Sequence, residues 1–93
     1  MAAKNWTFHT DPGHGWLQVK AEDLEHLGIS DKVSGYSYRR GDDVYLEEDC
    51  DAGLFIEEYL LQTGMKRDEL GASIKSKFHN DDAPCRSFRQ YWV

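Results

Sequence analysis

The chain has 93 residues and a net charge of −6, and 40% of its residues are hydrophobic. A chain of this length holds one hydrophobic core, so we expect residues 1–93 to form a single domain. The negative charge disfavours direct nucleic-acid binding, and no apolar run approaches the length of a membrane span or a secretory signal. We therefore expect no membrane contact and a cytoplasmic location.

The first third of the chain predicts a β-hairpin followed by a short helix. Residues 6–9 and 16–19 have the composition of short strands, and the Asp11-Pro12-Gly13 sequence between them is typical of a tight turn. Residues 21–27 predict a helix, because acidic side chains stand in its first turn and Gly28 follows as a C-terminal cap.

The rest of the chain predicts a second hairpin, a longer helix and further strands. The clearest helix signal is an apolar stripe of helical period that begins at Ala52 and ends before Gly64. Residues 66–71 predict a charged loop or a short helical turn. Strands are expected at 36–38, 44–46 and 74–78, with one more edge strand in the tail 88–93.

The order of these elements, β-β-α-β-β-α-β, predicts an α+β domain. Hairpins separated by helices favour an antiparallel or mixed sheet of about five strands, with two helices packed on one face. The two cysteines, Cys50 and Cys85, are expected to be reduced thiols, because secreted domains of this size carry a denser disulfide framework.

A glycine-rich turn near the N-terminus carries candidate metal ligands. His9, Asp11 and His14 lie within six residues of one another, and imidazole and carboxylate groups bind divalent metals such as zinc. One hypothesis is therefore a metal-binding or metal-dependent hydrolytic domain, with His79 completing the site if its strand lies beside the first strand. The alternative is structural, with the aspartate building the turn and the histidines bonding the loop backbone.

Acidic residues are concentrated in the middle of the chain. Residues 22–58 hold twelve acidic and three basic side chains, a net charge of −9. Such a segment is either a solubilising surface or a docking surface for a basic protein. The carboxylates of residues 47–51, where a strand leads into a helix, could also hold Mg²⁺ or act as an acid–base pair. The structural alternative is that they cap the helix and stabilise its N-terminus. The residues expected to contact a basic partner are Asp42, Asp43, Glu47, Glu48, Asp49, Asp51, Glu57 and Glu58.

Two sequence motifs, FHTDPGHGWL at residues 8–17 and YLEEDCDAGLF at residues 45–55, occur together with Arg86-Ser87 near the end of the chain. In combination they resemble a family of small uncharacterised proteins of bacteria, phages and plasmids. The resemblance implies a mobile-element setting and supplies no catalytic residues. In that setting small acidic proteins, anti-CRISPR proteins among them, act on host machinery.

The leading hypothesis is a non-enzymatic protein-binding module, without a cofactor, whose acidic surface docks a basic partner. Inhibition of a host nucleic-acid-binding defence complex is the role that the resemblance implies for it. The first alternative is the metal-dependent domain, and the second is a structural component of a larger complex. We call residues 9–15 the histidine loop and residues 47–51 the acidic helix entry. Proximity of the two segments would favour the metal-dependent alternative, whereas their separation would favour partner binding.

Overall fold

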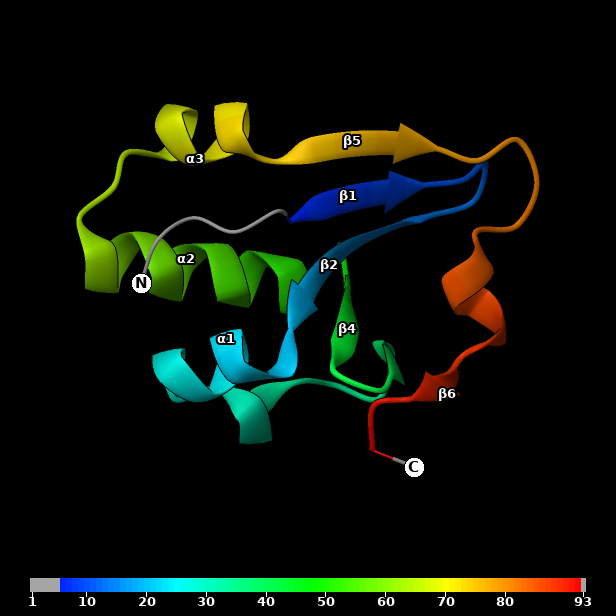
Figure 1. Cartoon of the computed structure of the whole chain (residues 1–93), viewed down its shortest axis with the longest axis horizontal. Coiled ribbons are helices and arrows are strands. Elements are labelled where there is room, and N and C mark those ends of the chain that lie inside the picture. The colour runs from blue at the N-terminus through cyan, green and yellow to red at the C-terminus, as the bar shows by residue number, and fades with distance from the viewer. Residues whose placement is uncertain (1–5, 93) are drawn as a thin grey trace.

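Six strands form one mixed sheet in the computed structural model, which describes residues 6–92 (Figure 1). Their order across the sheet is β5-β1-β2-β4-β3-β6. In chain order the strands are β1 (Thr7–Thr10), β2 (Gly15–Lys20), β3 (Tyr38–Arg40), β4 (Asp43–Glu47), β5 (Lys75–Phe78) and β6 (Arg89–Gln90).

Three α-helices and two short 3-10 helices complete the part of the chain that the structure describes. The helices α1 and α2 both end at a glycine in the left-handed region, Gly28 with φ 74° and Gly64 with φ 73°, as the sequence predicts. None of the helices in residues 6–92 is long and apolar enough to cross a membrane. The helices are α1 (Ala21–Leu27), η1 (Ser30–Lys32), α2 (Asp51–Thr63), α3 (Arg67–Ser73) and η2 (Pro84–Ser87).

The strand pairing brings distant parts of the chain together. The predicted hairpins are present as the antiparallel pairs β1–β2 and β3–β4. The central contact is β2 against β4, in which Trp16 lies opposite Glu47, and this pair joins the two hairpins into one sheet. At one edge β5 runs parallel to β1, so that Lys77 lies opposite His9. The last strand, β6, extends the other edge through β3.

The sheet is covered by apolar side chains on both faces. On one face, alternate residues of the central strands, such as Leu17 and Val44, pack against residues of all three helices, including Phe55. On the other face, Trp16 forms a smaller cluster with Ala83 and Cys85 beneath the segment that leads into η2. This second cluster fixes the 83–88 segment over the end of the sheet where the histidine loop lies.

The structure confirms the α+β class and differs from the prediction in three details. The sheet has six strands where about five are expected, because the additional edge strand expected in the tail does form, as β6. A third helix, α3, forms where a charged loop or a short helical turn is predicted, and buried Leu70 anchors it in the core. The third strand begins at Tyr38, after the start of the predicted range 36–38, because Ser37 directs its hydroxyl to the Asp51 carboxylate.

Candidate metal centre

Asp11 organises the loop between β1 and β2. Its carboxylate accepts hydrogen bonds from the backbone N–H groups of Gly13, His14 and Ala83, at 2.8 to 2.9 Å. The guanidinium of Arg86 donates two more, from Nε at 2.6 Å and from Nη2 at 3.0 Å. The Arg86 bond and these backbone bonds hold the pKa of Asp11 well below its usual range, although burial acts in the opposite direction. Asp11 therefore ties the loop to the C-terminal segment and has no role left as a free ligand.

Gly13 in this loop and Gly15 at the start of β2 make room for charged neighbours. A Cβ atom at Gly13 would lie 2.9 Å from Nη2 of Arg86, and one at Gly15 would lie 2.9 Å from Oε2 of Glu48 and 2.9 Å from Cζ of Phe8. Neither glycine has a positive φ, so it is close packing that requires them. A larger residue at either position would therefore collide with the side chain of Arg86, Glu48 or Phe8.

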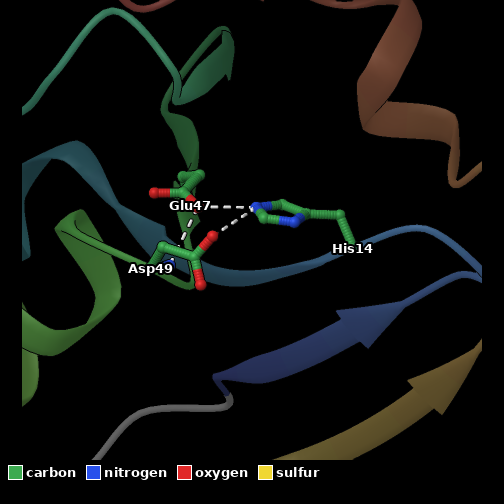
Figure 2. A group of neighbouring side chains, drawn as sticks. All are labelled: His14, Glu47 and Asp49. Carbon is green, nitrogen blue, oxygen red and sulfur yellow. Dashed lines mark hydrogen bonds and ion pairs between the residues drawn. The ribbon is translucent and has the colours of Figure 1, made fainter.

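His14 points from this loop toward the end of β4, between two carboxylates (Figure 2). Its Nε2 atom lies 2.6 Å from Oε2 of Glu47 and 3.9 Å from Oδ2 of Asp49. One ligand atom from each residue lies within 4.8 Å of the other two, and these residues are the one such group of three candidate ligands within residues 6–92. We call His14, Glu47 and Asp49 the metal triad. The pairing of β2 with β4 creates it, because it places the loop before β2 beside the residues that follow β4.

The Glu47 carboxylate is held in place by backbone hydrogen bonds from the two residues near the start of α2. It is 6% exposed and accepts hydrogen bonds from the backbone N–H groups of Asp49, at 2.9 Å, and Cys50, at 3.0 Å. Burial raises the pKa of Glu47, but these two bonds and the His14 bond outweigh it, and the pKa is lowered. Glu47 is therefore a preorganised anion, which is the state in which a carboxylate binds a metal.

The second ring nitrogen of His14 also faces a carboxylate. Nδ1 lies 3.4 Å from Oε1 of Glu48, whose backbone N–H donates to the Gly15 carbonyl at 3.1 Å. Metal-bound histidines commonly donate their other N–H to a carboxylate, which fixes the tautomer and the ring orientation. Glu48 occupies that place beside His14.

Asp51 supports the triad from the N-terminus of α2. Its buried carboxylate accepts hydrogen bonds from the backbone N–H and hydroxyl of Ser34 and from the hydroxyl of Ser37. Ser37 in turn accepts a hydrogen bond from the backbone N–H of Glu47 at 3.0 Å. This network links the 33–37 segment, the end of β4 and the start of α2 into one rigid unit.

A cleft opens beside the metal triad and has a volume of about 380 Å³. Outside the metal triad, the cleft is lined by three aromatic rings, the guanidinium of Arg86 and the side chain of Cys50. Tyr36 is 73% exposed, and the Arg86 guanidinium lies 4.8 Å from the centre of the Trp16 ring. We call this space the histidine cleft; its lining residues are His14, Trp16, Tyr36, Tyr38, Glu47, Asp49, Cys50 and Arg86.

The structure does not bring the three predicted metal ligands His9, Asp11 and His14 together. His9 is instead bonded to His79, with Nδ1 and Nε2 3.0 Å apart, and to Oε1 of Gln18 at 2.8 Å. His79 lies next to His9, as expected if the last long strand lies beside the first, because β5 pairs with β1. Asp11 is saturated by its own hydrogen bonds, so His14 is the one predicted ligand that joins a group of three.

The eight acidic residues predicted to contact a basic partner are also divided. Glu47 and Asp51 are 6% and 4% exposed and bond within the chain, so they hold the fold together and offer little surface to a partner. Asp43 forms an ion pair with Lys20 at 2.7 Å, at the end of β4 opposite to Glu47. The others are exposed or half-exposed: Asp42, Glu48, Asp49, Glu57 and Glu58.

From the sequence, Glu47 and Asp49 are expected as partner contacts or as Mg²⁺ ligands, and nothing in the sequence joins them to His14. The signal that could have joined them is the register of β2 against β4, which no local pattern specifies. Comparison of the chain with protein-family models, curated proteins and solved structures finds no match. The family resemblance therefore stays a prediction, but the three segments that carry it, 8–17, 45–55 and 86–87, all contribute side chains to the histidine cleft.

Proposed function

We propose that the protein binds one divalent metal ion through His14, Glu47 and Asp49, at the edge of the histidine cleft. The observation that carries the proposal is the convergence of an imidazole nitrogen and two carboxylate oxygens within 4.8 Å. Three protein ligands beside an open cleft are the arrangement of metal sites that also bind an outside molecule. The proposal replaces the ligand set His9, Asp11 and His14 with one that the fold holds together.

Metal binding requires a change of tautomer at His14. Nε2 lies 2.6 Å from Oε2 of Glu47, and because an ionised carboxylate only accepts, this hydrogen bond requires a proton on Nε2, whereas a metal ligand needs that nitrogen unprotonated. The proton can move to Nδ1, which lies 3.4 Å from Oε1 of the negatively charged Glu48 side chain. Glu48 is therefore expected to strengthen metal binding without touching the metal.

The ligand types favour a borderline metal ion. One imidazole and two carboxylates suit Zn²⁺ or Mn²⁺ better than a purely oxygen-seeking ion such as Ca²⁺ or a thiol-seeking ion such as Cu⁺. Cys50 lines the cleft but is not part of the metal triad. We therefore expect Zn²⁺ and Mn²⁺ to bind, and Ca²⁺ to bind more weakly.

Calorimetric titration of the chain with Zn²⁺ and Mn²⁺ tests the proposal. We expect one ion per chain, and a loss of affinity of at least about tenfold in His14→Ala and in Asp49→Asn. Glu48→Gln should weaken binding by about 10- to 100-fold, as loss of a carboxylate behind a histidine ligand does. His26→Ala is the matched control, because His26 is exposed on α1 and outside the triad. Equal affinity in His14→Ala and in the wild-type chain would contradict the proposal.

A second candidate function is the docking of a basic protein partner. It is supported by Glu48 and Asp49, whose side chains are 38% and 76% exposed beside the cleft. Attraction between such groups and a basic surface would speed association and weaken as salt is added. The roles of inhibitor and of component of a larger complex both belong to this candidate.

Charge reversal at the exposed carboxylates tests the second candidate. A basic partner recovered by affinity purification should lose binding when Glu48 and Asp49 are both changed to lysine. The same change at Glu22 and Glu25, which are exposed on α1, is the control and should leave binding unaltered. Partner binding that survives the reversal at residues 48 and 49 would count against this candidate, whatever the metal titration shows.

A further inference from the structure

Among the residues that the structure describes, Arg86 is the arginine that lines the histidine cleft, and its guanidinium is positively charged. We propose that the cleft binds a small phosphate monoester, with phosphoryl oxygens shared between the metal ion and the Arg86 guanidinium. This inference rests on the proposed metal site and adds the class of molecule that the site receives. Four features support it: the fixed position of Arg86, its unused donors, the charge of the cleft and the size of the cleft.

The Arg86 side chain is fixed before any ligand arrives. Asp11 holds it by two hydrogen bonds, the Trp16 ring lies 4.8 Å from it, and Gly13 leaves the space that Nη2 occupies. An exposed arginine without such contacts loses side-chain entropy when it binds a ligand, and that loss weakens affinity. Arg86 is therefore prepared to bind an anion at low entropic cost.

The guanidinium has hydrogen-bond donors to spare. Arginine carries five N–H donors, and Asp11 accepts from Nε and from Nη2. Within residues 6–92 the remaining N–H groups of Arg86 have no hydrogen-bond acceptor, and the side chain is 34% exposed. A guanidinium with free N–H groups in a cleft is a binding group for a phosphate or a carboxylate.

The charge of the cleft makes anion binding depend on the metal. Glu47 and Asp49 in the lining and Glu48 beside it contribute three negative charges, and the positive charge of Arg86 is offset by Asp11 and by Asp82, whose Oδ1 lies 4.0 Å from Nε. Without a cation this environment repels an anion, whereas a divalent ion offsets two of the three charges. Anion binding is therefore expected with the metal ion and not without it.

Shape favours a small phosphate monoester over the other anions. A phosphoryl group has three terminal oxygens and can contact both the metal and Arg86, whereas a carboxylate has two oxygens for the same task. A cleft of about 380 Å³ has the size of a small-molecule site, and the rings of Tyr36 and Tyr38 border the space for the organic part. The net charge of −6 disfavours a long nucleic acid.

The test uses the whole chain loaded with one equivalent of Mn²⁺ or less, and inorganic phosphate as the probe. Protein-bound Mn²⁺ should shorten the ³¹P relaxation time of phosphate in a saturable way, and no phosphate should bind to the metal-free chain. Arg86→Lys should weaken phosphate binding by about tenfold or more, since it removes the paired donors, while its affinity for Mn²⁺ stays unchanged. Arg40→Lys is the control, because Arg40 lies outside the cleft and over the Phe88 ring.

Arg86 also supports the fold through Asp11, so a measurement on the wild-type chain is needed as well. In the Zn²⁺-loaded wild-type protein, the Nε–H resonance of Arg86 should shift when phosphate is added and should stay in place when Zn²⁺ is omitted. Phenyl phosphate should bind at least as tightly as inorganic phosphate, because its ring can lie against the tyrosines.

The outcomes separate the two proposals. Failure of Mn²⁺ and Zn²⁺ to bind would remove both. Metal binding without any effect of phosphate on Arg86 or on ³¹P relaxation would overturn the phosphate inference and leave the metal site standing. Phosphate binding that is the same without metal, or a 5′-phosphorylated oligonucleotide that binds more tightly than phenyl phosphate, would also overturn it.

Discussion

The substitution Ser37→Ala tests whether the Asp51 network supports the candidate site. Ser37 is fully buried, donates its hydroxyl to Asp51 and accepts the backbone N–H of Glu47. Alanine at this position removes both bonds and leaves the Glu47 N–H without its partner in the interior.

The size of the effect follows from these two bonds. A hydrogen bond to a charged group contributes about 1.5–3 kcal/mol, and an orphaned buried donor costs about 1–3 kcal/mol. Because the two bonds share one hydroxyl and are not additive, we expect a loss of about 2–4 kcal/mol in the free energy of unfolding. For a domain of this size that loss lowers Tm by roughly 10 °C or more.

Urea unfolding followed by tryptophan fluorescence, together with a thermal scan, measures this loss. Ser87→Ala is the matched control, because the Ser87 hydroxyl is exposed and donates one bond to the Pro84 carbonyl. The control should lose less than about 0.5 kcal/mol. If the two alanine variants unfold at the same urea concentration, the network does not support the site as described.

Three further predictions concern packing and pH. Gly15→Ala should destabilise the fold by about 1–3 kcal/mol, because its Cβ would lie 2.9 Å from the Phe8 ring. Gly53→Ala should stabilise the fold by about 0.5–1 kcal/mol, because Gly53 lies in α2 with open space around its Cα. Urea midpoints of the two variants that shift in the same direction would refute this prediction. Burial lowers the pKa of His9, and the charges of His79 and Lys77 lower it further, against the raising effect of the hydrogen bond to Gln18. Because the folded state then disfavours protonation of His9, the free energy of unfolding should fall as pH drops below about 6.5. A His9 pKa measured by NMR at or above that value, or a His9 pKa that His79→Gln does not raise, would contradict this prediction. The pKa of Asp11 is depressed in the folded state, so its contribution to stability is present above about pH 4 and is lost as pH falls further. Asp11→Asn should therefore reduce the fall in the free energy of unfolding below about pH 4. An equally steep fall in the variant would be inconsistent with the ion pair between Asp11 and Arg86.

Local signals predicted most of the secondary structure. The sequence Asp11-Pro12-Gly13 marks the turn of the first hairpin. Gly28 and Gly64 mark helix ends through their own backbone conformation, because both have a positive φ. The helix α3 and the start of β3 were harder to predict. Their positions depend on the burial of Leu70 and on the bond from Ser37 to Asp51, which are tertiary contacts.

The candidate site depends on contacts that no local pattern specifies. His14 and Glu47 meet because β2 pairs with β4, and Asp11 meets Arg86 across 75 positions of sequence. The histidine loop and the acidic helix entry could each be identified as chemically unusual, but whether they adjoin is a property of the sheet register. Their proximity favours the metal-dependent interpretation over a purely acidic docking surface.

The most direct test of the account is to follow the ring nitrogens of the four histidines by two-bond ¹H–¹⁵N correlation NMR while Zn²⁺ is added. The account predicts that Nε2 of His14 alone takes the shift of a metal-bound nitrogen, with the proton moving to Nδ1, while His9, His26 and His79 keep their resonances. Zn²⁺ that first perturbs the His9–His79 pair, or that leaves His14 unchanged at saturation, would contradict it.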